Sequence, residues 1–190
     1  MKARKNTKRK RRIRRLSILL SLLLLLAAGA YVLYNRVFPI EHESYITTYA
    51  DEYGVDPYLV YGIIHTESRF REDAVSPAGA MGLMQVTPET GEFIAGRMGM
   101  DNYTEEMLKD PETNIRMGIY YLSYLEEKFP RIETRLAAYN AGPNRVAEWL
   151  EDESVSDGEV LQNIPFEETR NYVERVLQRE KIYRILYFYK

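Results

Sequence analysis

The stretch DPYLVYGIIHTES, residues 56–68, decides the fold of this chain, because it combines a complete helix start with a helical apolar pattern. Asp56 can accept a hydrogen bond from the first free N–H groups of a helix, and Pro57 suits the first helical position. The pattern predicts a helix that runs to about Ser68. The following residues, 69–86, contain proline and glycine and are predicted to form a loop.

Glu67 is the unusual residue of this helix, because it lies on the apolar face. That face is formed by residues at positions i, i+3 and i+4, which are Val60, Ile63 and Ile64, and Glu67 follows at i+7. A carboxyl group on the core side is desolvated, which raises its pKa and favours a general acid near neutral pH. The alternative is a structural role in a buried salt bridge with Arg69 or Arg135.

Further helices are predicted on both sides of this one. Their expected ranges, each bounded by a cap residue, a proline or a glycine, are 45–53, 87–99, 110–130, 131–141 and 166–189. No segment shows the sustained alternation of apolar and polar residues that is typical of a strand, so a sheet is not expected. The sequence therefore predicts a mostly α fold.

The amino-terminal part of the chain has the pattern of a membrane anchor. Ten of the first 15 residues are Lys or Arg, the first acid is Glu41, and residues 16–35 contain no charged side chain. Twenty helical residues span roughly 30 Å, which is the thickness of a hydrocarbon core, and the positive charges should stay cytoplasmic. The alternative is a cleaved signal peptide with a cleavage site at the small residues 28–30.

These patterns divide the chain into four expected parts. They are a basic cytoplasmic head at 1–15, a transmembrane signal-anchor at 16–35, a tether at 36–43 and a globular domain at 44–190. Both the anchor and the signal peptide place the domain outside the cytoplasm, and the anchor makes the protein a single-pass protein of the cell membrane.

The composition excludes several classes of function. Beyond Arg36 the chain has 15 basic residues against 28 acids, a formal charge of about −13, so phosphate would be repelled and no nucleic-acid partner is expected. The chain has no cysteine, and its two histidines, His42 and His65, form no metal-ligand pattern. No metal and no cofactor are therefore expected.

Five ordered blocks of sequence resemble the catalytic domain of the soluble-type lytic transglycosylases, which cleave the glycan strands of bacterial peptidoglycan. The blocks are ES at 67–68, SPAGAMGLMQVTP at 76–88, NIRMG at 114–118, AYNAG at 138–142 and IPFEETRNYV at 164–173. The resemblance covers roughly residues 45–182. It implies a lysozyme-like helical fold with a sugar-binding groove, and peptidoglycan as the partner.

The resemblance also implies a role for each matched residue. Glu67 falls on the single catalytic acid and base of the family. Ser76 and Gln85 fall on positions that contact the sugar beside the cleaved bond. Tyr139 falls on the position whose hydroxyl holds the catalytic carboxylate, and Asn140 lies beside it in the groove wall.

The family mechanism ends in a ring closure rather than in hydrolysis. It cleaves the β-1,4 bond between N-acetylmuramic acid and N-acetylglucosamine and leaves 1,6-anhydro-N-acetylmuramic acid ends. Two alternatives remain open from the sequence. One is a muramidase of goose-lysozyme type on the same fold, and the other is a membrane-anchored module that binds peptidoglycan without cleaving it.

Overall fold

The computed structural model describes residues 2–187, with side chains for residues 12–187 except 30, 33 and 35. The chain divides into two compact units, Met1–Ile40 and Glu41–Lys190, which are considered one at a time.

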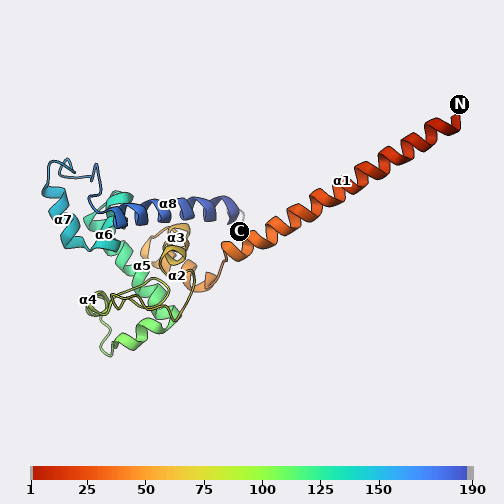
Figure 1. Ribbon diagram of the computed structural model, residues 1–190. Helices are drawn as coiled ribbons and strands as arrows, with labels where there is room; N and C mark the ends of the chain where they lie inside the picture. The colour runs from red at the N-terminus through yellow and green to blue at the C-terminus, as the bar shows by residue number, and fades with distance from the viewer. Residues whose placement is uncertain (1, 188–190) are drawn as a thin grey trace. The chain divides into compact units, whose positions relative to one another are not determined.

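The first unit consists mainly of one helix, α1 (Lys2–Val37), drawn without interruption in Figure 1. Between residues 13 and 32, its leucine and isoleucine side chains are all more than half exposed. Averaged over its length α1 is polar, because basic residues crowd its first 15 positions. Within the described residues, no helix is both long enough and apolar enough to span a membrane. The transmembrane helix predicted at residues 16–35 is therefore not supported by the structure.

The second unit is built from helices. They are α2 (Glu43–Tyr53), α3 (Pro57–Glu67), α4 (Pro88–Met98), the short 3-10 helix η1 (Glu105–Lys109), α5 (Pro111–Lys128), α6 (Ile132–Ala141), α7 (Pro143–Glu151) and α8 (Glu167–Tyr187). Across residues 2–187 there is no strand, and strand-like pairing is limited to three isolated bridges. The predicted mostly α fold is confirmed.

The helix starts follow the capping residues that the sequence contains. The side chain of Asp56 accepts a hydrogen bond of 2.9 Å from the backbone N–H of Tyr58, and that of Asp110 accepts one of 2.8 Å from Thr113. A proline occupies the first turn of both helices. Local capping chemistry therefore sets where α3 and α5 begin.

Helix α7 departs from the sequence prediction, which ended a helix at Gly142 and Pro143 and started no other. Gly142 has a φ of 91°, which turns the chain sharply. Pro143 then occupies the first turn of α7, where its missing N–H costs nothing. The same dipeptide thus ends one helix and begins the next.

Helix α3 lies at the centre of the core. Its residues Val60, Ile63 and Ile64 are fully buried. Helix α8 packs against α3, and Figure 1 draws the two helices next to each other. Gly62 permits this close approach, because a Cβ atom there would lie only 2.9 Å from the backbone oxygen of Val176.

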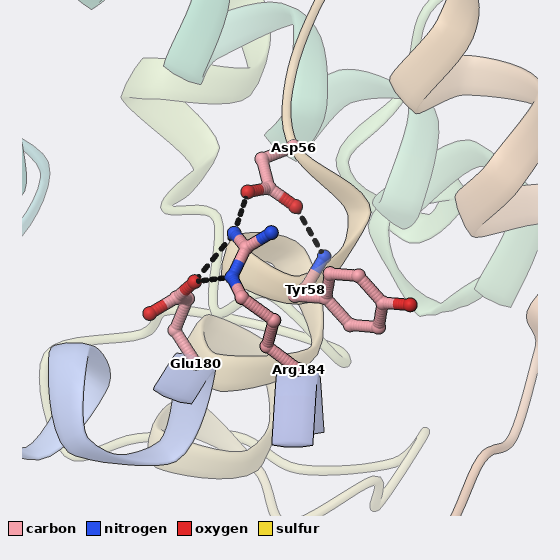
Figure 2. A network of polar contacts seen from close by, with 4 residues as sticks. All are labelled: Asp56, Tyr58, Glu180 and Arg184. Carbon is pink, nitrogen blue, oxygen red and sulfur yellow. Dashed lines mark hydrogen bonds and ion pairs between the residues drawn. The ribbon is translucent and has the colours of Figure 1, made fainter. Parts of the chain in front are cut away.

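A charged network ties the amino-terminal end of α3 to α8 (Figure 2). The guanidinium of Arg184 donates to Asp56 and also, from its Nε atom at 2.7 Å, to Glu180. The same guanidinium lies 5.0 Å from the ring centre of Tyr58. Asp56 thus caps α3 and pairs with α8, so this end of α3 is held in place while the opposite end carries Glu67.

Candidate active site

Glu67 is the last residue of α3, where the helix meets the loop of residues 69–86. Its side chain is half-buried, and the loss of hydration is the main cause that raises its pKa from the ordinary 4.5 to about 7. The hydroxyl of Tyr172 and the guanidinium of Arg175 act in the opposite direction, because both favour the carboxylate. A carboxyl group with this pKa can donate a proton near neutral pH and take one back.

Tyr172 reaches Glu67 from α8 and is buried. Its hydroxyl acts on the Glu67 carboxyl as a hydrogen-bond donor, which lowers the pKa of that carboxyl. The contact is loose, since no acceptor meets strict hydrogen-bond geometry with the Tyr172 hydroxyl within the part of the chain that the structure describes. A weak hydrogen bond explains why desolvation, not Tyr172, determines the direction of the pKa shift.

Tyr139 lies close enough to Glu67 for their charges to interact. Burial raises the pKa of Tyr139 well above 10, and the negative charge of Glu67 adds to the shift. Its hydroxyl donates a hydrogen bond of 2.8 Å to the backbone oxygen of Met84. Because the Tyr139 proton is used in this bond, it is not available to hydrogen-bond the Glu67 carboxylate.

The loop that contains Met84 is anchored by Asn114 of α5. The buried side-chain oxygen of Asn114 accepts a 2.8 Å hydrogen bond from the N–H of Met84. Its amide nitrogen donates to the backbone oxygens of Met81 at 2.9 Å and Leu108 at 2.7 Å. A Cβ atom on Gly82 would lie 2.4 Å from that amide nitrogen, so the loop approaches α5 too closely for any larger residue. Asn114 thus holds the backbone N–H of Met84, and Tyr139 holds its backbone oxygen.

Gln85 and Ser76 use polar groups to secure the loop. The amide nitrogen of Gln85 donates to the backbone oxygens of Ala74 at 3.0 Å and Gly82 at 2.9 Å. Gln85 also has a φ of 50°, a left-handed conformation that is unfavourable for residues with a side chain. The hydroxyl of Ser76 accepts a 3.0 Å hydrogen bond from the N–H of Ala80.

The structure therefore separates the predicted site residues into two groups. Tyr139 is within electrostatic reach of Glu67. For Ser76, Gln85 and the exposed Asn140, no interaction with Glu67 is observed among the described residues. Their predicted contact with a sugar stays a prediction.

The salt-bridge alternative for Glu67 is wrong. Arg135 is paired with Glu126 at 2.7 Å and also donates to the backbone oxygen of Pro130 at 2.9 Å. Between residues 12 and 187, wherever side chains are described, Glu67 has no ion-pair partner within 4.0 Å, Arg69 included.

Tyr172 and Asn114 lie in matched sequence blocks, but the sequence did not predict their individual roles at this site. The stretch of residues 165–172 was expected either to wall the cleft or to pack the last helix onto the domain. Tyr172 lies on the apolar stripe of the last predicted helix, where a packing role is the simplest interpretation. A buried tyrosine hydroxyl needs a polar partner, so a tyrosine on this apolar stripe already indicated a polar group packed against it. Asn114 gave a similar signal, since a polar amide begins the buried face of α5.

The described residues contain no group of three or more His, Asp or Glu side chains able to hold a metal ion. His65 is buried, and its Nδ1 atom lies 3.2 Å from the hydroxyl of Tyr183. Burial and the charges of Arg179 and Arg69 lower the pKa of His65 to about 4. The arrangement can donate and accept a proton at one carboxyl group, that of Glu67, which interacts electrostatically with the hydroxyls of Tyr139 and Tyr172.

Comparison with known proteins gives a consistent family. A family model described as "Transglycosylase SLT domain" matches residues 44–161. The soluble lytic murein transglycosylase of Escherichia coli strain K12 is 36% identical over 152 residues, which cover 77% of this chain and 23% of that protein. The membrane-bound lytic murein transglycosylase C of Histophilus somni strain 2336 is 30% identical over 160 residues, which cover 72% of this chain and 44% of that protein. The chain thus spans less than half the length of either relative.

Solved structures agree with this comparison. An inactive glutamate-to-glutamine mutant of lytic transglycosylase Slt from Pseudomonas aeruginosa superposes with a TM-score of 0.69 at 37% identity, over 78% of this chain and 24% of that one. The complex of the 70-kDa soluble lytic transglycosylase with bulgecin A gives a TM-score of 0.72 at 32% identity, over 85% and 27% of the two chains. Tyr172 and Arg175 lie beyond the residues that the family model matches.

Proposed function

We propose that this chain, which belongs to the transglycosylase SLT domain family, cleaves the glycan strands of peptidoglycan with Glu67 as its single general acid and base. The observation that carries the proposal is the desolvated Glu67 carboxyl with its pKa of about 7, which interacts electrostatically with the buried hydroxyls of Tyr139 and Tyr172. The names of the relatives supply the substrate and the reaction class, and the inactive glutamate-to-glutamine mutant supports the importance of one carboxyl group.

The proposed reaction begins with proton donation. The protonated carboxyl of Glu67 gives its proton to the glycosidic oxygen between N-acetylmuramic acid and N-acetylglucosamine, and that oxygen leaves as a hydroxyl group. The N-acetyl group of the muramic residue stabilises the anomeric carbon. At this stage Glu67 is ionised, and the hydroxyl of Tyr172 stabilises its negative charge.

The reaction ends with a ring closure. The C6 hydroxyl of the muramic residue attacks C1 and transfers its proton to Glu67, which regains its starting state. The product is a 1,6-anhydro end, and no water is consumed. An attack within one sugar has a high effective molarity, so it can compete with water. A single carboxyl group with a pKa near neutrality suits both halves of this sequence.

Ser76, Gln85 and Asn140 are proposed to bind the sugar in a groove beside Glu67. Support for this comes from the loop itself, which several hydrogen bonds and a left-handed Gln85 hold in one conformation. Such preorganisation is costly and is typical of binding sites. Because the donor end of Gln85 is occupied, its amide oxygen is the group proposed to meet a sugar hydroxyl.

The experiment is product analysis by mass spectrometry after digestion of purified sacculi with the full chain. The proposal expects 1,6-anhydro ends with the unmodified protein and no glycan cleavage with Glu67→Gln. The matched control is Glu127→Gln, an exposed position on α5, which should cleave normally. Reducing ends would show a muramidase, and binding without cleavage would show a non-catalytic module.

We further propose that α1 attaches the domain to a cell membrane as a single-pass anchor, with the catalytic domain outside the cytoplasm. The support is the cluster of ten basic residues at its start, followed by exposed leucine side chains, and the membrane-bound name of one group of relatives. The hydropathy of the described helices weighs against a full span. Carbonate extraction tests the anchor: a 22.3 kDa protein should stay in the membrane pellet, and a shorter soluble form would contradict it.

A further inference from the structure

We propose that Arg69, Arg175 and Arg179 form a carboxylate-binding subsite beside Glu67, which takes the acidic substituent that muramic acid carries at C3. The inference rests on the proposed function and specifies which glycan strands the enzyme prefers.

The packing of α8 on α3 brings two of these arginines to the catalytic end of α3. Arg179 donates a 2.7 Å hydrogen bond from its Nη1 atom to the hydroxyl of Thr66, the residue before Glu67. Tyr172, on the same helix, acts on Glu67 itself. Arg175 lies three residues after Tyr172 and four before Arg179, so the three side chains share one face of α8.

Arg69 belongs to the loop that follows α3, two residues after Glu67. Its N–H donates to the backbone oxygen of Ile64 at 3.1 Å, and its φ of 53° turns the chain away from the helix axis. The side chain is exposed. After burial, the charges of Arg175 and Arg69 are the causes that lower the pKa of Arg179, so each of these two guanidinium groups lies within electrostatic range of Arg179.

This cluster of positive charge lies in an acidic domain and, within the described part of the chain, has no carboxylate within 4.0 Å to neutralise it. Four other arginines of the domain, Arg116, Arg131, Arg135 and Arg184, have carboxylate partners within 4.0 Å. Four more, Arg71, Arg97, Arg145 and Arg170, contact backbone oxygens or aromatic rings instead. For Arg69, Arg175 and Arg179, no such carboxylate partner exists among the described side chains. Three like charges held together repel one another, and an external anion relieves that repulsion.

The chemistry of the substrate identifies the anion. Muramic acid carries a lactyl ether at C3, which bears either a free carboxylate or a peptide stem with carboxylates of its own. Guanidinium groups bind carboxylates through paired hydrogen bonds. Because Glu67 acts on the bond of this same sugar, a substituent of that sugar lies beside the catalytic group.

The experiment compares three substrates with the full chain. They are glycan strands with their peptide stems, peptide-free strands with free lactyl carboxylates, and peptide-free strands whose lactyl groups have been converted to neutral methylamides. The readout is the ratio of kcat/KM between a charged and the neutral substrate, for the unmodified protein, Arg69→Gln, Arg175→Gln and the double variant. Each is measured at its own optimum pH, because Arg175 also acts on the pKa of Glu67.

We expect the ratio to fall roughly two- to fivefold in each single variant and about tenfold in the double variant, because exposed charge pairs contribute modestly. Arg131→Gln, an exposed arginine at the start of α6, is the matched control and should keep the ratio. If the kcat/KM ratio falls only for peptide-bearing strands, the subsite binds the carboxylates of the peptide stem. If it falls equally for strands with free lactyl groups, the subsite binds the lactyl carboxylate. An unchanged ratio overturns the subsite.

A binding measurement separates this inference from the proposed chemistry. In a Glu67→Gln background, the dissociation constant for peptide-bearing strands should rise on adding Arg69→Gln and should rise with salt. If the unmodified protein cleaves no strand but this charge-dependent binding persists, the proposed reaction fails and the subsite stands. A dissociation constant that changes neither with Arg69→Gln nor with salt overturns the subsite.

Discussion

Replacing Glu67 by Gln is expected to stabilise the folded protein above pH 7, although the same change removes the proposed proton donor. Burial raises the pKa of Glu67 from 4.5 to about 7, so the folded state binds a proton there more tightly than the unfolded state does. Below pH 4.5 the group is neutral in both states and costs nothing. As the pH rises to about 7, the unfolded state is increasingly favoured because it ionises first.

The size of the effect follows from the pKa shift. Each pKa unit corresponds to about 1.36 kcal/mol. A rise from 4.5 to about 7 therefore makes the unmodified protein about 3 kcal/mol less stable at pH 8 than a protein whose residue 67 stays neutral. Glutamine has a similar shape and does not ionise. In thermal unfolding the difference corresponds to roughly 6–12 °C in Tm for a domain of this size.

The assay is urea unfolding of the full chain and of Glu67→Gln between pH 4.5 and 8.5. The gain in free energy of unfolding should be small at pH 4.5, grow between pH 4.5 and 7, and stay constant above that. Glu127→Gln serves as the exposed control and should show no such growth. A gain that does not change with pH, or a Glu67→Gln variant less stable than the unmodified protein at pH 8, would refute the reasoning.

Three further predictions concern the neighbours of Glu67 and the far end of α3. Tyr172→Phe removes a hydrogen bond that favours the carboxylate, so the pKa of Glu67 should rise and the descending limb of kcat/KM against pH should move to higher pH; an unmoved limb would count against the contact. Asn114→Ala leaves the N–H of Met84 and two backbone oxygens without partners, and it should lower the free energy of unfolding by roughly 2–4 kcal/mol, measured by urea unfolding. Asp56→Ala removes a helix cap and should cost about 1–2 kcal/mol by the same assay while the pH of half-maximal activity stays in place, since Asp56 lies at the opposite end of α3.

Local chemistry explains which parts of this molecule could be predicted from sequence. The start of α3 follows from Asp56 and Pro57, because capping needs only neighbouring residues. The raised pKa of Glu67 follows from its position on an apolar helix face. Both inferences use residues within one helix, so neither depends on how the chain folds back on itself.

Long-range packing explains what the sequence did not show. Tyr172 meets Glu67 only because α8 crosses α3 at Gly62, about a hundred residues away along the chain. In the same way, the Tyr139 hydroxyl was expected to hold the carboxylate, and it instead donates its proton to Met84. No local pattern reports which backbone oxygen a distant loop will present.

The pKa of Glu67 tests the central claim most directly. It can be measured from the side-chain carboxyl ¹³C shift of glutamate-labelled protein, with Glu67→Gln used to assign the signal. The account predicts a midpoint at about 7, and the descending limb of kcat/KM on peptidoglycan at the same pH. A midpoint near 4.5 would mean that the carboxyl is hydrated and ionised at neutral pH, and it would contradict the role of Glu67 as the proton donor.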